Sequence, residues 1–159
     1  MLISQPPEVS FQVFYDELSP YGNWIQDPAY GYVWIPSYGS GFTPYRTNGY
    51  WAYTDYGWSW VSTYNWGWAP FHYGRWMFDD NYGWEWVPQY EWAPAWVIWG
   101  DYDSYYGWAP LEPNIGIDVY YRPPMHHWCF VPHNRMNQVN VSNYVVNNTV
   151  IVNNNITII

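Results

Sequence analysis

Basic side chains occur among aromatic rings at regular positions in the chain. Arg46 and His72 lie 26 residues apart, and Arg75 follows shortly after His72. Arginine and histidine can stack on aromatic rings and donate hydrogen bonds. These three side chains therefore either hold the protein's own rings and backbone or contact an anionic sugar.

Aromatic side chains alternate with other residues in several short segments, as where Trp58 and Trp60 flank Ser59. Side chains alternate between the two faces of a strand, so such rings gather on one face. The simplest interpretation is a buried core. The alternative is a platform for a glycan, whose C–H faces stack on rings while polar side chains bind its hydroxyl groups. The ligand-binding candidates for that alternative are Tyr50, Tyr53, Tyr73, Arg46, His72, Arg75, Tyr102 and Tyr105.

A compact group of possible soft-metal ligands comprises His126, His127, Cys129 and His133. On a strand, His127 and Cys129 would share a face, but the group lacks the paired-cysteine spacing of zinc fingers. Two acidic stretches, 79–81 and 101–104, could supply oxygen ligands to calcium, although turns that use Asp side chains explain them equally well. We therefore expect no metal and no cofactor.

Catalytic signals are weak in this sequence. Glu85 and Glu91 could in principle flank a glycosidic bond, but they occupy variable positions of a repeat. Nothing resembles a nucleophile elbow or a phosphate-binding loop. The sequence therefore predicts a protein that is not an enzyme.

The chain is organised around a motif that occurs three times at a period of 26 residues. The copies are Tyr30-Gly31-Tyr32-Val33-Trp34, Tyr56-Gly57-Trp58-Ser59-Trp60 and Tyr82-Gly83-Trp84-Glu85-Trp86. Each repeat opens with Gly-x-Trp, continues through a strand and a turn that ends on Gly, and returns in an alternating strand. This pattern predicts β-hairpins with an aromatic core face and a second face that meets water.

The predicted fold is all-β, with repeated hairpins that form an antiparallel barrel, a sandwich or a hairpin stack. Residues 1–113 form the aromatic repeat domain, with repeats at 20–46, 47–72 and 73–97 and a partial one at 98–113. A first strand is expected at 9–15. Residues 114–159 form an extension with strands at 115–121 and 128–131 and an extended, Asn-rich β segment from Asn137 onward.

Composition limits the possible partners. The 159 residues are 25% aromatic and 11% charged, contain no Lys, and carry a formal charge of -9. Nucleic acid and anionic membrane surfaces attract clustered Lys and Arg, so the composition disfavours both as partners and we expect no binding to nucleic acid. No apolar run approaches the roughly 20 residues of a membrane-spanning helix. The start does not resemble a signal peptide, so the protein is either cytoplasmic or the mature form of an exported one. The polar, Lys-free, Asn- and aromatic-rich composition favours export.

Three motifs carry a family resemblance. They are the Tyr-Gly-Trp-x-Trp-Val element, the Trp-Ala-Pro-Ala-Trp-Val element and the string Gly67-Trp68-Ala69-Pro70-Phe71-His72-Tyr73-Gly74-Arg75-Trp76. These motifs make the sequence similar to a bacterial family of domains of unknown function, the one numbered sixty-six hundred. The resemblance covers about 9–113, and the tail after Pro124 departs from the family pattern. It implies export and a location in the bacterial envelope or exterior. It implies no activity, and no catalytic residue carries over from it.

Two functions follow as hypotheses. The first is a structural or protein-interaction module of the bacterial cell envelope or exterior, in which the Asn-rich tail pairs with a partner strand or with a second copy. The second is binding of a polysaccharide or peptidoglycan through exposed Trp and Tyr rings. The location expected for either is the periplasm, the outer membrane surface or the extracellular space.

Overall fold

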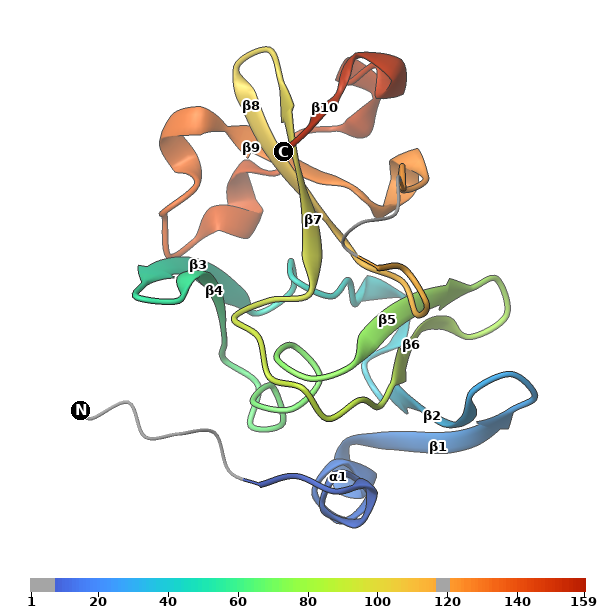
Figure 1. Cartoon of the computed structure of the whole chain (residues 1–159). Coiled ribbons are helices and arrows are strands. Elements are labelled where there is room, and N and C mark those ends of the chain that lie inside the picture. Colours follow the sequence, from blue (N-terminus) through green and yellow to red (C-terminus); the bar gives the residue numbers. More distant parts are fainter. Residues whose placement is uncertain (1–7, 117–120) are drawn as a thin grey trace.

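The computed structural model describes residues 8–116 and 121–159, and most of its regular structure is antiparallel strand (Figure 1). One helix, α1 (Phe11–Leu18), precedes the strands. The strands are β1 (Gly22–Asp27), β2 (Gly31–Pro36), β3 (Gly49–Thr54), β4 (Gly57–Ser62), β5 (Arg75–Asp79), β6 (Gly83–Val87), β7 (Val97–Tyr102), β8 (Tyr105–Pro110), β9 (Cys129–Pro132) and β10 (Thr157–Ile158). Short 3-10 turns lie at Ser19–Tyr21, Gly39–Gly41, Met125–His127, His133–Arg135, Val141–Tyr144, Asn148–Val150 and Asn153–Asn155.

The four predicted hairpins are confirmed as β1–β2, β3–β4, β5–β6 and β7–β8. Their turns form as the sequence indicated. The Asp79 carboxylate accepts the backbone N–H groups of Asn81 and Tyr82, both at 2.8 Å. Gly83 closes the same turn at a φ of 75°, a conformation that costs glycine little because it has no Cβ.

Each hairpin carries a pair of tryptophans directly opposite each other on its two strands. The pairs are Trp24 with Trp34, Trp51 with Trp60, Trp76 with Trp86, and Trp99 with Trp108. The second member of every pair belongs to one buried cluster. Equivalent repeats therefore share a common indole-lined interior, as the period predicted.

The glycine that opens each repeat has a packing role. A Cβ added to Gly49 would lie 2.5 Å from the Trp60 ring, and one added to Gly74 would lie 2.6 Å from the Trp86 ring. These separations are far shorter than van der Waals contact. The Gly-x-Trp motif therefore lets the first strand approach the indole of the return strand.

The hairpins assemble into separate sheets with strand orders β1-β2-β6-β5 and β10-β7-β8-β9, and a two-stranded sheet of β3 and β4. Trp34 pairs with Trp86 where the first and third hairpins join. None of the sheets described closes on itself, so a sandwich or hairpin stack fits and a barrel does not. Figure 1 shows β3–β4 and β5–β6 on opposite sides of the molecule.

The predicted first strand at 9–15 is wrong, because this segment forms helix α1. The Ser10 hydroxyl accepts the N–H of Val13 at 3.2 Å and caps the helix, as serine does at such positions. Phe14 and Leu18 lie four residues apart and are both buried. The helical spacing of these two residues, and not the loose alternation, therefore decides the structure of this segment. Phe14 packs edge-on against Trp86, with ring centroids 5.0 Å apart.

The prediction that the second face of the hairpins meets water is wrong for the first and third hairpins, whereas Ser59 of the second hairpin is half-buried. Val33 and Glu85 are buried, at 0% and 3% exposed. Arg75 lies on the same face as Glu85 and donates to the backbone carbonyls of Glu112 and Ile115 at 3.0 and 2.8 Å. The segment that follows β8 thus lies against this face of the sheet.

The tail does not form the extended β segment that its composition predicted. From 141 to 155 it runs mainly through 3-10 turns, and only β10 pairs, with β7. Asparagine side chains explain the difference because they compete for backbone groups. The Asn147 side chain accepts the N–H of Thr149, and the Asn148 amide donates to the carbonyls of Met125 and Trp128.

Two further predictions concern the extension. The predicted strand at 128–131 is confirmed as β9, whereas the one at 115–121 falls largely on 117–120, outside the described residues. Met136 and Val141 of the extension are buried in the same cluster as the hairpin tryptophans. Within the described ranges, no helix has the length and apolar character needed to cross a membrane.

Candidate functional site

Tyrosine and tryptophan side chains differ in how far they are exposed in this protein. The large exposed side chains of the described residues include many tyrosines but none of the 15 tryptophans. The phenol hydroxyl can meet water while the ring packs, which suits tyrosine to the surface. A half-buried tryptophan that lines a cleft is therefore the kind of indole that could offer its ring to a ligand.

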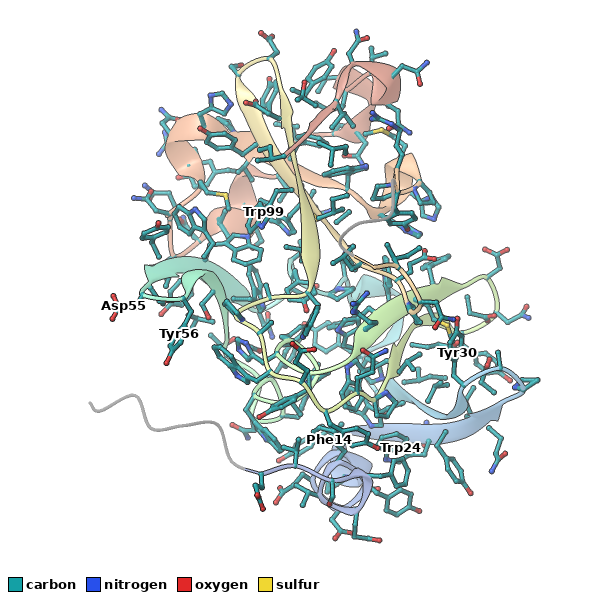
Figure 2. The ribbon with its side chains drawn as sticks, viewed as in Figure 1. Phe14, Trp24, Tyr30, Asp55, Tyr56 and Trp99 are labelled. Atoms are coloured by element: carbon teal, nitrogen blue, oxygen red, sulfur yellow. The ribbon has the colours of Figure 1, made fainter. Side chains whose placement is uncertain are left out.

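Two half-buried tryptophans of this kind lie between the second and fourth hairpins. Trp58, Trp99 and Tyr106 line a cleft of about 620 Å³, which we call the Trp58 cleft. Clefts of roughly 300–1,000 Å³ hold small ligands in most proteins. Figure 2 shows Trp99 on the side of β7 that faces the β3–β4 hairpin.

The rings of the cleft are held by neighbouring rings. Tyr53 lies edge-on to Trp58, with centroids 5.2 Å apart and planes at 72°. Trp99 packs against the buried Trp51 at 4.7 Å. Because these partner rings belong to hairpins that carry tryptophan pairs, packing within the hairpins fixes the positions of Trp58 and Trp99 beside the cleft.

A polar edge completes the cleft. His133 packs against the Tyr106 ring at 4.0 Å, and its Nε2 lies 3.1 Å from Oδ1 of Asp101. The backbone N–H of His133 donates to the carbonyl of Ser104. The exposed residues Asn134 and Asn137 lie along the same edge. The arrangement offers flat apolar rings beside hydrogen-bonding groups, which is the chemistry that recognises a sugar.

The basic residues His72 and Arg75 serve the protein's own structure. His72 Nδ1 lies 2.9 Å from the carbonyl of Ala93, and its ring stacks on Trp92. Burial lowers the pKa of His72. Arg75 lies over the Trp96 ring at 4.7 Å while it donates to the segment after β8. For both side chains, the geometry matches the stacking and backbone bonding that was the simpler interpretation.

The predicted tyrosines lie in varied surroundings, and none of them lines the Trp58 cleft. Tyr73 is buried, so its prediction as an exposed ring is wrong. Tyr50, Tyr102 and Tyr105 are half-buried and pack against the core clusters. Tyr53 is 74% exposed and supports Trp58.

Arg46 is exposed, and it also lies outside the lining of the Trp58 cleft. Its charge acts on the buried thiol of Cys129. The structure therefore does not gather the eight predicted residues at one place.

The candidate metal ligands do not come together as one group, although the His126 and His127 rings are in contact at 4.3 Å. His127 is buried against Trp84 and has its Nδ1 3.4 Å from Glu112, and burial followed by the His126 charge lowers its pKa to about 4. Burial raises the pKa of Cys129 to about 12, so the thiol stays protonated. Among the described residues, no three His, Cys, Asp or Glu side chains are grouped so that they could hold a metal ion.

The two glutamates considered for catalysis occupy different surroundings. Glu85 is buried, and burial together with Asp79 and Asp27 raises its pKa to about 7. Glu91 is exposed and acts on Arg75. In each acidic stretch considered for calcium, an Asp side chain has a partner within the protein. Asp79 accepts backbone N–H groups of its turn, and Asp101 interacts with His133.

Sequence reasoning missed Trp58, Trp99 and Tyr106 as site residues, and had considered His133 only as a metal ligand. A usable signal existed for two of the rings. Trp58 and Tyr106 each lie two residues before the buried tryptophan of their strand. This position shares the core face but lies nearer the turn, where the sheet ends and solvent begins.

Fold and cleft together define an all-β hairpin-repeat protein with an aromatic surface cleft. The chain belongs to a family of unknown function, DUF6600, whose family model matches residues 15–115. This match confirms the resemblance seen in the repeat motifs. No curated protein and no solved structure matched the chain.

Proposed function

We propose that this protein is a non-enzymatic module of the bacterial cell envelope or exterior that binds a neutral polysaccharide in the Trp58 cleft. The observation that carries the proposal is the combination of three rings, Trp58, Trp99 and Tyr106, with the polar edge of His133 and two asparagines. A β-linked pyranose with equatorial hydroxyls presents C–H groups on both faces and hydroxyls around its rim. Its shape and polarity complement this cleft.

Charge favours a neutral ligand over an anionic one. The protein carries a formal charge of -9 and no Lys. Arg75 and Arg122 donate to backbone carbonyls, and Arg135 lies over the Tyr144 ring. None of these cations lines the Trp58 cleft, and the overall charge repels acidic polymers.

The residues lining the cleft also favour binding over hydrolysis. Most glycoside hydrolases place two carboxyl groups on either side of the bond they break. The described lining of the Trp58 cleft contains no Asp or Glu side chain, and Asp101 beside it interacts with His133. A module that holds a polymer without cutting it agrees with a structural role outside the cell.

Titration with soluble oligosaccharides tests the proposal directly. Cellohexaose, laminarihexaose, chitohexaose and peptidoglycan fragments are added to the protein, and binding is followed by tryptophan fluorescence and calorimetry. Trp58→Ala and Tyr106→Ala are each expected to weaken binding by at least about tenfold, a loss of about 1.4 kcal/mol.

Tyr56→Ala is the matched control. Tyr56 is an exposed ring at the tip of the same hairpin but does not line the cleft (Figure 2). Its loss should leave binding unchanged within about twofold. If none of the saccharides binds the wild-type protein at millimolar concentration, the proposal is refuted.

A second candidate function is association with a protein partner or a second copy through the Asn-rich tail. Val139, Val150 and Val152 are exposed on this segment, at 72%, 52% and 51%. Exposed apolar side chains can contact another chain, and strand addition beside β10 is one way for a partner to bind. We place this candidate second because most of the tail's backbone is engaged within its own chain.

Deleting the tail would remove buried Val141 and Ile151, so surface variants give the cleaner test. The triple variant Val139→Ser, Val150→Ser, Val152→Ser is compared with the wild type by light scattering across a concentration series. Loss of a wild-type dimer in the variant supports association through the tail. A wild type that stays monomeric up to high concentration refutes self-association, and capture of the same proteins by both forms refutes a tail-bound partner.

A further inference from the structure

One repeat position lines a surface cleft in every hairpin. It lies two residues before the buried tryptophan of the return strand, and its occupants are Tyr32, Trp58, Trp84 and Tyr106. Trp58 and Tyr106 both belong to the Trp58 cleft, while Trp84 and Tyr32 each line a cleft of their own. The repeat thus buries one ring in the core and places the preceding ring of that face beside a cleft, where Tyr32 and Tyr106 are exposed, Trp58 is half-buried and Trp84 is 7% exposed.

Trp58 and Trp84 are separated by one period and have matching geometry. Tyr53 meets Trp58 with centroids 5.2 Å apart and planes at 72°. Phe78 meets Trp84 with centroids 5.3 Å apart and planes at 74°. In both cases the partner ring comes from the opposite strand of the hairpin. The two hairpins therefore present the same pair of rings beside a cleft.

The cleft beside the third hairpin, which we call the Trp84 cleft, has a volume of about 560 Å³. Its rings include Phe78, Tyr82 and Trp84, and its polar residues include Asn81 and His126. Each cleft has a histidine beside a ring, although the geometry differs: His126 meets Phe78 edge-on at 5.3 Å, whereas His133 lies at 32° to Tyr106 at 4.0 Å. Size, rings and polar edge therefore correspond between the two clefts.

Charge also selects the same class of ligand. Asp80 lies in the lining of the Trp84 cleft, and the described lining contains no Arg. A carboxylate accepts hydrogen bonds from sugar hydroxyls and repels an anionic polymer. The ligand that fits is again a neutral glycan.

The Tyr32 cleft provides an internal contrast. It is lined by Phe11, Tyr30, Tyr32, Pro88 and Tyr90, and its volume is about 210 Å³. This lies below the usual range of ligand sites, and the lining lacks amide, carboxylate and imidazole groups. The same repeat position therefore makes a cleft in each hairpin but a site of adequate size and polarity at only two places.

We infer that the Trp84 cleft is a second glycan site, which makes the protein bivalent for a neutral β-linked polysaccharide. This inference rests on the proposed function of the Trp58 cleft. The two hairpins that carry the equivalent ring pairs lie on opposite sides of the molecule (Figure 1). A protein with sites on opposite sides joins two polymer strands, and it gains avidity when both sites are occupied.

The number of sites is measured by calorimetry with cellohexaose and chitohexaose. The wild type is expected to bind two molecules per chain. Phe78→Ala, Tyr82→Ala and Trp58→Ala are each expected to leave one site, and Trp58→Ala combined with Tyr82→Ala to leave none. Tyr82 is 59% exposed, so its variant keeps the test decisive if Phe78→Ala does not fold. Tyr90→Ala, in the Tyr32 cleft, is the control and should retain two.

Cross-bridging is measured by light scattering with hydroxyethyl cellulose and glycol chitin. The wild type should join polymer strands, and so raise the apparent mass of at least one polymer well beyond that of a single strand with protein bound to it. Each single-site variant should not raise the mass beyond that of a single strand with protein bound. One saccharide per wild-type chain, unaffected by Phe78→Ala and Tyr82→Ala but lost in Trp58→Ala, refutes the second site and leaves the proposed function intact. Absence of any binding refutes both.

Discussion

The hairpins and the Asn-rich tail share a strong tendency to form strands, yet they fold differently. In the first three hairpins, each turn has an acceptor side chain such as Asp79 and a glycine at positive φ, and the return strand of all four hairpins carries a buried tryptophan. In the tail, Asn147 and Asn148 bind backbone groups and the chain folds into 3-10 turns. The comparison shows that β-propensity yields strands only where turn chemistry and a buried face accompany it.

The largest expected effect comes from removing a core indole. Trp86 is 0% exposed, and its N–H donates to the carbonyl of Tyr73 at 2.7 Å. Trp86→Ala should lower the free energy of unfolding by about 4 kcal/mol, because it leaves a large cavity. Val152→Ala in the tail should cost less than about 0.5 kcal/mol. Urea denaturation of both variants measures the difference, and similar losses would contradict the contrast between hairpins and tail.

A second prediction separates packing from backbone conformation. Gly74 and Gly83 both have positive φ, at 70° and 75°. A Cβ on Gly74 would lie 2.3 Å from the carbonyl oxygen of Val87, whereas one on Gly83 meets nothing within 4 Å. Gly74→Ala should therefore cost about 3 kcal/mol or more and Gly83→Ala about 1 kcal/mol. Equal thermal shifts for the two variants would show that the close approach to Trp86 is unimportant.

A third prediction concerns the tail. Asn148 donates to the carbonyls of Met125 and Trp128, at 3.0 and 3.2 Å. Asn148→Ala should lower the free energy of unfolding by about 1–2 kcal/mol. The neighbouring Asn154 is exposed, and Asn154→Ala should have no measurable effect. Hydrogen exchange of the tail amides would show whether the loss is local, and unchanged protection in Asn148→Ala would contradict the assigned role.

The smallest effect depends on pH. The pKa of buried Glu85 is raised to about 7 from an ordinary value near 4.5, so the folded state holds this proton more tightly than the unfolded state. Its contribution to stability is fully present below the unfolded pKa and is lost as the pH rises through about 7. The wild type should lose about 1 kcal/mol in this window relative to Glu85→Gln.

Urea denaturation at pH 4, 6 and 8 measures the difference between wild type and Glu85→Gln. The control is Glu91→Gln, because Glu91 is exposed, and it should follow the wild type at every pH. A Glu85→Gln curve parallel to that of the wild type would show that Glu85 titrates normally in the folded protein.

Much of the fold could be predicted from sequence because its signals are short-range. Within each 26-residue repeat, the Asp and Gly turn residues and the Trp alternation act within a few positions, and all four hairpins form where they indicated. The candidate site was less predictable. Trp58 and Tyr106 could be placed on the core face of a strand, but their meeting in one cleft depends on how the second and fourth hairpins pack.

Amino-acid sequence by itself determined the repeats, the turns and the buried indoles. Tertiary structure alone decided which faces are covered, where the clefts lie and how the tail folds. Tyr45 illustrates the reason: its hydroxyl donates to the carbonyl of Phe71 and accepts the N–H of Trp96, and its carbonyl accepts the Trp108 indole from 63 residues away. Contacts between such distant segments depend on the shapes of assembled hairpins, which no local pattern encodes.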